Sequence, residues 1–197
     1  MVLTRIPDSW AWMRTDILIR LVPFAIAFAI AWWVTRGASW LGLSLGDVAV
    51  QLIFALIAAP VMFAAAAAVQ LWLTRRRHAL SVPAGLGDAA FQAGFYAVNG
   101  PLEEAFFRGL VQGWLTWAIN PLVGFAVGTA TYVLYHRLGR WTWADTLATG
   151  LVGIPLGLAY WLLPGPPSLL GISIAHIAAT CGFLGPGPLL LRRLGLL

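Results

Sequence analysis

The chain has 197 residues, of which 60% are apolar and only 10% are charged, and its mean hydropathy is +0.84. A soluble domain of this length would carry about a quarter charged residues, so the composition excludes an ordinary soluble domain and predicts an integral membrane protein. The net charge of +5 comes from arginine alone. Because most of these arginines stand at the ends of apolar runs, they indicate topology and contacts with lipid head groups rather than binding of nucleic acid.

Apolar runs follow one another along the whole chain and predict an all-α, polytopic transmembrane bundle of about six spans. Residues 1–16 contain Trp10 and Trp12 and are expected to form an interfacial lead-in, a segment that lies at the membrane interface before the first span. The predicted spans cover residues 17–35, 48–74, 89–118, 122–136, 143–163 and 168–191. Too little polar sequence remains for a separate soluble domain, so residues 1–197 are predicted to form a single integral membrane domain.

Arginine positions predict the orientation of this bundle. With six spans both termini share one side of the membrane, Arg36 lies opposite, and Arg108 lies within the membrane. The arginines on the side of the termini are Arg5, Arg14, Arg20, Arg75, Arg76, Arg77, Arg137, Arg140, Arg192 and Arg193. The positive-inside rule then predicts cytoplasmic termini, and we expect a multi-pass protein of the bacterial cytoplasmic (inner) membrane. Arg20, near the end of the first span, is expected to snorkel outward.

Strongly titratable side chains that the predicted spans place inside the bilayer, away from the span ends where Arg20 snorkels, are few: Glu103, Glu104, Arg108, His136 and His176. A charge within the bilayer costs several kcal/mol by most estimates, so it is rarely kept without a partner or a task. Three separate spans supply these residues, as a site between bundle helices requires. A functional site is therefore predicted, with hydrolysis or proton and ion transport as the chemistries that fit it.

Helical spacing separates the two glutamates. Residues four apart share a helix face, so Glu104 and Arg108 can pair, whereas Glu103 is turned about 100° away. We expect the pair to orient its helix and Glu103 to be the carboxylate that acts. The reverse assignment, with Glu104 acting, stays open because an arginine fork can reach both. The sequence Gly100-Pro101 in the middle of this span is expected to kink the helix or split it.

The two histidines stand in similar local patterns. Tyr132 lies one turn before His136, and Thr180 lies one turn after His176. A carboxylate with two histidines is sufficient to activate water, either directly or through a metal. A divalent metal such as zinc, held by Glu103, His136 and His176, is therefore one expectation, and direct general-base action is the other.

At these residues the chain resembles the CPBP family of intramembrane proteases, the CAAX protease and bacteriocin-processing group. The family motif Glu-Glu-x-x-x-Arg stands here at 103–108, Phe-x-x-x-His appears as Tyr132 to His136, and His-x-x-x-Asn as His176 to Thr180. The resemblance covers roughly residues 89–191 and keeps the order and spacing of all three motifs.

This resemblance implies roles for the motif residues. Glu103 would activate water, His136 would help to hold that water or a metal, and His176 with position 180 would face the developing oxyanion. Tyr132 in place of phenylalanine is a mild departure. Thr180 in place of asparagine is larger, because a hydroxyl is shorter than an amide, and loss of an oxyanion donor costs about 3 kcal/mol.

The sequence thus predicts an intramembrane endopeptidase of glutamate or metal type, acting on a membrane-associated protein or peptide in the lipid bilayer. A non-catalytic scaffold or bacteriocin-immunity protein on the same fold, and a proton-coupled transporter, are the alternatives; the oligomeric state is left open. In straight spans Glu103 and His136 would lie about 22–24 Å from the outer membrane face and His176 about 12 Å. The three can meet only if the spans tilt or kink, or if the segment 164–167 dips into the membrane, which we expect together with a cavity open toward the cytoplasmic half.

Overall fold

The computed structural model describes residues 9–77, 82–139 and 141–197, and within these ranges every regular element is helical. The elements in chain order are α1 (Trp10–Asp16), η1 (Ile17–Leu21), α2 (Val22–Val34), η2 (Ser39–Leu41), α3 (Val48–Arg77), α4 (Leu86–Glu104), η3 (Ala105–Gly113), α5 (Trp114–Ala118), α6 (Pro121–Tyr135), η4 (His136–Gly139), α7 (Trp143–Ala148), α8 (Gly150–Leu162), α9 (Leu170–Phe183) and α10 (Pro186–Arg193). The all-α prediction is confirmed for the described part of the chain. Arg5, His78 and Arg140 lie outside it.

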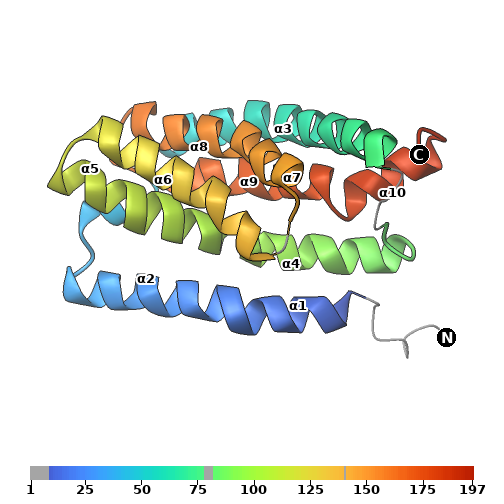
Figure 1. Ribbon diagram of the computed structural model, residues 1–197. Helices are drawn as coiled ribbons and strands as arrows, with labels where there is room; N and C mark the ends of the chain where they lie inside the picture. Colours follow the sequence, from blue (N-terminus) through green and yellow to red (C-terminus); the bar gives the residue numbers. More distant parts are fainter. Residues whose placement is uncertain (1–8, 78–81, 140) are drawn as a thin grey trace.

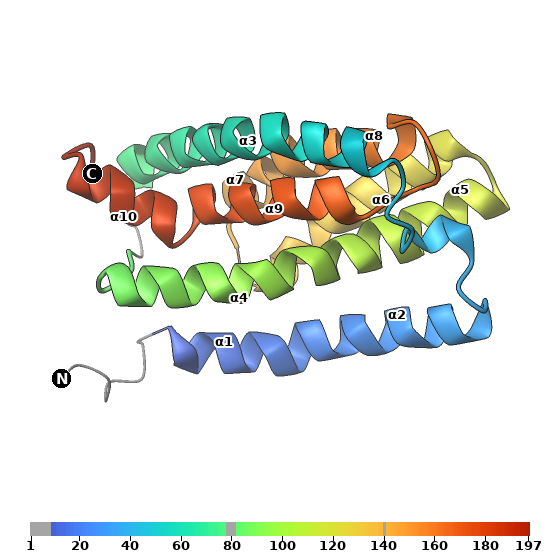
Figure 2. The same ribbon diagram turned by 180° about the vertical axis from the view of Figure 1, so that it is seen from behind.

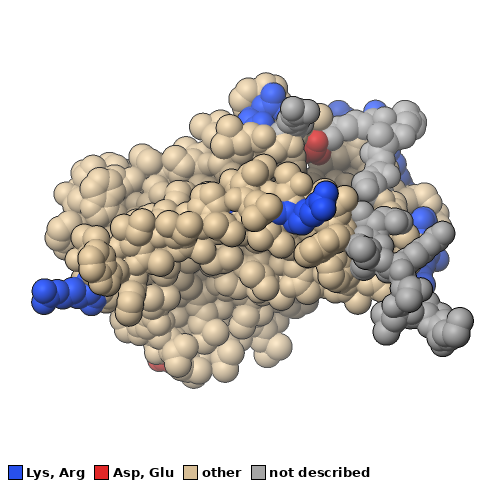
Figure 3. Space-filling view, turned by 90° about the horizontal axis from the view of Figure 1, so that it is seen from below, with Lys and Arg blue, Asp and Glu red and all other residues tan. Residues whose placement is uncertain are grey.

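Among the residues that the structure describes, two helices are long and apolar enough to cross a membrane, namely Trp10–Val34 and Val48–Arg76. A third joins them if α9 and α10, which meet at a bend of 44°, form one span. In Figure 3 most of the surface that the described residues form on the visible face is uncharged, as expected for contact with lipid. The chain is thus a helical membrane protein, and its described part contains two to three such helices, whereas the count of six spans and the dip of the segment 164–167 stay predictions.

The N-terminal helix consists of α1, η1 and α2 in unbroken succession, and its middle part, η1, is π-helical. Both views place it at the edge of the bundle, beside α4 (Figures 1 and 2). The helix begins at Trp10, inside the expected interfacial lead-in over residues 1–16, and the placement of residues 10–16 at the membrane interface stays a prediction. The many apolar side chains at its surface, such as Ile19, Ile26 and Trp33, suit a membrane-facing position.

The centre of the bundle is the contact of α9 with α3 on one side and α4 on the other (Figure 2). Small residues permit this close approach: a Cβ added to Gly182 would lie 2.2 Å from the carbonyl oxygen of Phe63, and one at Gly171 would lie 2.7 Å from that of Gln51. Small residues at helix contacts are the usual solution in membranes, where packing replaces the hydrophobic effect. This packing fixes α9, which carries His176, against its neighbours.

The third predicted span is formed by α4, η3 and α5. Gly100-Pro101 was expected to kink this span or to split it; it does not split it, because α4 continues through Pro101 to Glu104, and the kink stays a prediction. The irregularity lies instead directly after it, where the chain becomes π-helical from Ala105 to Gly113. Gly113 allows the backbone at Trp40 to pack closely there, since an added Cβ would lie 2.1 Å from the Trp40 carbonyl oxygen. Such π-helical turns are frequent at functional sites.

Candidate active site

Three helices bring the predicted site residues together near the middle of the bundle. Glu103 and Glu104 end α4, His136 follows α6, and His176 lies in α9. The Nε2 atom of His176 is 3.5 Å from Oε2 of Glu103, and its Nδ1 atom is 2.6 Å from Oε1 of Glu104. The structure thus brings Glu103 and His176 into contact, although straight spans had placed them at different depths.

Glu104 and Arg108 form the predicted pair, with 3.3 Å between the Arg108 Nε atom and Oε2 of Glu104. Neither side chain has any exposed surface. Arg108 also donates to the carbonyl oxygen of Gly153 at 2.8 Å and to the hydroxyl of Thr129 at 3.2 Å. A buried charge is stable only when it is paired and hydrogen-bonded, and Arg108 meets both conditions.

Glycines in α8 create the space for this arginine. A Cβ added to Gly157 would lie 3.0 Å from the Nη1 atom of Arg108, and one at Gly153 would lie 2.7 Å from the ring of Tyr132. The Tyr132 ring in turn lies under the guanidinium of Arg108, with 5.2 Å between the ring centroid and Cζ. The glycine-rich stretch of the sequence therefore serves the packing around the ion pair.

Glu104 has a second contact that the spacing did not reveal, because it also holds His176. A carboxylate oxygen can only accept a hydrogen bond unless it is protonated, so Nδ1 of His176 carries the hydrogen that points to Glu104. The other ring nitrogen, Nε2, then faces Glu103 and the hydroxyl of Tyr132, which is 3.3 Å away. Glu104 is thus the residue that orients the imidazole, as carboxylates commonly do for functional histidines.

His136 is oriented by its own helix. Its Nδ1 atom lies 2.8 Å from the carbonyl oxygen of Tyr132, which can only accept, so Nδ1 carries the hydrogen. In the neutral ring the Nε2 atom therefore has a free lone pair. The aromatic rings of Tyr135 and Trp141 contact the imidazole, with centroids 4.2 Å and 5.0 Å from its own, and they restrict its rotation.

Arg20 is the site residue that the sequence reasoning missed. The expectation that it snorkels outward was wrong: its guanidinium forms an ion pair with Glu103, bonds Asn99 and the Tyr135 hydroxyl at 2.6 Å each, and pairs with Asp16 of its own helix. An uncompensated Glu103 inside the bundle attracts the nearest cation. The signal in the sequence was that Glu103 had no counter-ion, while Arg20 stood within a predicted span.

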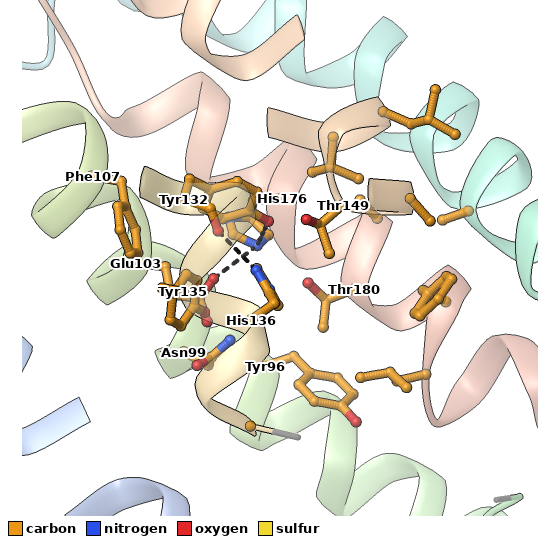
Figure 4. Close-up of a pocket in the computed structure, with 18 of the residues that line it drawn as sticks. Tyr96, Asn99, Glu103, Phe107, Tyr132, Tyr135, His136, Thr149, His176 and Thr180 are labelled. Carbon is orange, nitrogen blue, oxygen red and sulfur yellow. Dashed lines mark hydrogen bonds and ion pairs between the residues drawn. The ribbon is translucent and has the colours of Figure 1, made fainter. Parts of the chain in front are cut away.

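A cavity of about 1320 Å³ adjoins the site, and its walls are mainly apolar. Glu103, His136, His176 and Thr180 line it, whereas Glu104 and Arg108 do not. In Figure 4 the first three point toward one another, and the hydroxyl of Thr180 faces the histidines from α9. The cavity therefore gives a bound molecule access to Glu103, while the Glu104–Arg108 pair stays closed behind it.

The donor set partly suits the predicted metal. Both histidines line the cavity and have Nδ1 bound to an acceptor, which leaves Nε2 as the nitrogen able to bind a metal, as is usual for histidine ligands. However, one oxygen of Glu103 is held by Arg20, and the described residues contain no group of three His, Cys, Asp or Glu side chains placed to hold a metal ion. A metal such as zinc at Glu103, His136 and His176 stays a prediction.

Comparison with known proteins agrees with the motifs. Residues 85–181 match the family model described as type II CAAX prenyl endopeptidase Rce1-like. The matched region includes all three motifs, from Glu103 to Thr180. No curated protein and no solved structure matches the chain.

Proposed function

Because the chain belongs, through residues 85–181, to the CPBP family of CAAX-type intramembrane endopeptidases, we propose that it hydrolyses a peptide bond of a membrane-associated substrate with water activated by Glu103. The observation that carries this assignment is the contact between Glu103 and His176 at the wall of the cavity, with 3.5 Å between Oε2 and Nε2. A buried carboxylate that meets an imidazole at an accessible cavity is suited to general-base chemistry.

Water binds between Glu103 and His136. One hydrogen points to Oε2 of Glu103 and the other to Nε2 of His136, whose lone pair is free because its Nδ1 atom donates to Tyr132. Glu103 takes the proton as the water oxygen attacks the carbonyl carbon of the scissile bond. When the tetrahedral intermediate collapses, the C–N bond breaks and the proton on Glu103 passes to the leaving amine.

His176 stabilises the negative charge that develops on the carbonyl oxygen. The side chains of Asp16, Glu103 and Glu104 carry three negative charges in the cluster, whereas Arg20 and Arg108 carry two positive charges. A protonated His176 balances this set, and its Nε2–H then serves as a donor to the oxyanion. The Thr180 hydroxyl, at the same cavity wall, is the second donor, in the place of the asparagine amide of the family motif.

The family and the cavity support a membrane-associated, apolar substrate. The matching family model describes prenyl endopeptidases, and the mainly apolar walls of this cavity suit an apolar segment that arrives from the bilayer. We place the enzyme in a bacterial inner membrane with six spans and cytoplasmic termini. The match to a protease family gives no support to a scaffold, an immunity protein or a proton-coupled transporter.

The test uses the purified full chain in liposomes with two quenched fluorescent CAAX-type peptides of one sequence, one prenylated and one not. Wild-type protein is expected to cleave at least one of them at a single bond, identified by mass spectrometry. Glu103→Gln is expected to abolish cleavage, whereas Asp47→Asn, an exposed carboxylate that caps a helix, should leave it intact. Preserved cleavage in Glu103→Gln would defeat the assignment of the base.

A separate measurement addresses the predicted metal. Elemental analysis of the purified protein should give about one equivalent of zinc or another divalent ion if the two histidines and Glu103 bind it. A metal that disappears in the double variant His136→Ala/His176→Ala would place it at this site, and a metal that persists there would place it elsewhere.

A further inference from the structure

The N-terminal helix contributes a charged group to the active site although it precedes the matched family region. That region begins at residue 85, whereas Arg20 lies 83 positions before its partner Glu103. Arg20 also differs from Arg14 on the same helix, which is exposed. The site therefore includes a residue that the three family motifs do not contain.

Four side chains fix the guanidinium of Arg20. Its Nη1 atom donates to Oε1 of Glu103 and to the Tyr135 hydroxyl, and its Nη2 atom donates to Asp16 and to the amide oxygen of Asn99. These partners come from α1, α4 and α6, so the guanidinium connects three helices. Its planar fork holds oxygen acceptors in fixed directions, which a lysine ammonium does not do.

This arrangement makes the two oxygens of Glu103 different. Oε1 is occupied by Arg20, whereas Oε2 lies 3.5 Å from Nε2 of His176. Rotation of the carboxylate would break the ion pair inside a buried site, since Glu103 has only 2% exposed surface. Oε2 is therefore held in the direction of the histidines and the cavity.

Asp16 limits the effect of the cation on the base. A general base that is fully neutralised by an arginine is a poor proton acceptor, but Arg20 divides its two terminal nitrogens between Glu103 and Asp16. The pair thus fixes the position of Glu103 while a second carboxylate shares the positive charge.

The helix that carries Arg20 is itself held in place on α4 and η3. At its start, the Ser9 hydroxyl donates to Asp88 at 2.6 Å and accepts from Gln92 at 2.7 Å, and Ser9 is buried. Beyond Arg20, Phe24 stacks on Phe106 with 4.2 Å between ring centroids. Contacts on both sides of the π-helical segment 17–21 therefore keep Arg20 in position.

We propose that Arg20 is a positioning residue of the active site, which holds Oε1 of Glu103 so that Oε2 takes the proton from water. The N-terminal helix is then a required part of the catalytic unit. This inference rests on the proposed function, because it assigns a role toward the base of that reaction.

The test compares Arg20→Ala, Arg20→Lys and the control Arg14→Gln in the full chain, with the peptide that the wild type cleaves. Arg20→Ala is expected to lower kcat by about 10- to 100-fold, the usual effect of misplacing a catalytic group through its support, while KM changes little. Arg20→Lys, which keeps the charge but not the fork, should lose less. Arg14→Gln should match the wild type.

Chemical rescue separates positioning from a merely structural role. Guanidinium chloride at millimolar concentration should restore part of kcat in Arg20→Ala, whereas equal sodium chloride or urea should not. If Arg20→Ala does not accumulate in the membrane, Arg20→Lys is used instead. The proposal then predicts a lower kcat than that of the wild type while the thermal unfolding midpoint stays unchanged.

Unchanged or increased kcat in the Arg20 variants would overturn the inference, and an increase would show that Arg20 restrains the base. That failure differs from failure of the proposed function. In the first case Glu103→Gln is inactive and Arg20→Ala is active, whereas in the second Glu103→Gln itself keeps activity.

Discussion

The two faces of the helix that carries Glu103 and Glu104 contain the same kinds of residue in opposite settings. On one face Glu104 and Arg108 have no exposed surface and no contact with the cavity. On the other, Glu103 meets Arg20, which keeps about a fifth of its side chain exposed, at the cavity wall. Both are carboxylate–arginine pairs. Access to the cavity distinguishes them: Glu103 reaches the cavity and is the reactive group, whereas the Glu104–Arg108 pair stabilises the helix.

The difference also shows how the faces are connected. His176 contacts both carboxylates, with Nδ1 on Glu104 and Nε2 toward Glu103. The Glu104–Arg108 pair, on the closed face away from the cavity, thus does more than stabilise its helix. Glu104 also orients the imidazole of His176, which acts on the open face, where Glu103 lines the cavity. Changes on the closed face should therefore act first on stability, and changes on the open face first on the rate of cleavage.

The largest effect on stability is expected from Arg108→Met. It removes the cation while Glu104 stays buried, and breaking a buried pair in this way costs about 3–5 kcal/mol. The thermal unfolding midpoint in detergent, measured beside Arg193→Gln at an exposed position, reports the effect. Equal midpoints for the two variants would show that the Glu104–Arg108 pair does not stabilise the fold.

A smaller loss is expected from Gly153→Ala. The added methyl group would lie 2.7 Å from the Tyr132 ring, and overpacking of this kind costs about 1–3 kcal/mol. Gly94→Ala in α4 is the matched control, because an added Cβ there meets nothing within 4 Å, and the helix should gain up to about 1 kcal/mol. If both variants shift the unfolding midpoint alike, the tight fit of α8 around Arg108 and Tyr132 does not determine stability.

The smallest effect concerns the open face. Thr180→Val removes the hydroxyl without changing the shape of the side chain, and we expect kcat to fall about tenfold, below the 100-fold or more of a principal oxyanion donor. Thr180→Ser should keep the rate, and Thr180→Asn, which introduces the family residue, should equal or exceed it. Cleavage by Thr180→Val at the wild-type rate would remove position 180 from the mechanism.

Parts of this site were predictable because they depend on local periodicity. The Glu104–Arg108 pair follows from a spacing of four residues, and the meeting of α4 with α9 was expected from the motif resemblance. Arg20 was not predictable in this way, since its contact with Glu103 depends on how a separate helix docks, and its position near a span end favoured the wrong orientation. The second bond of Glu104, to His176, likewise depends on the packing of α9 and has no counterpart in sequence spacing.

The position of the π-helical segment could not be predicted from the sequence pattern either. Gly100-Pro101 is a familiar helix breaker, yet α4 passes through it and the π-helical turn begins at Ala105. Close contacts with neighbouring backbone, such as that of Gly113 with Trp40, accompany this turn. Such tertiary contacts decide where the backbone departs from an α-helix, and a single sequence does not display them.

The division of labour between the two glutamates is tested most directly by the cleavage rate of Glu103→Gln and Glu104→Gln, each measured on protein that is shown to be folded by its thermal unfolding midpoint. The account predicts that Glu103→Gln keeps its midpoint and loses cleavage, whereas Glu104→Gln lowers the midpoint and retains measurable cleavage wherever it remains folded. A folded, inactive Glu104→Gln beside an active Glu103→Gln would contradict it.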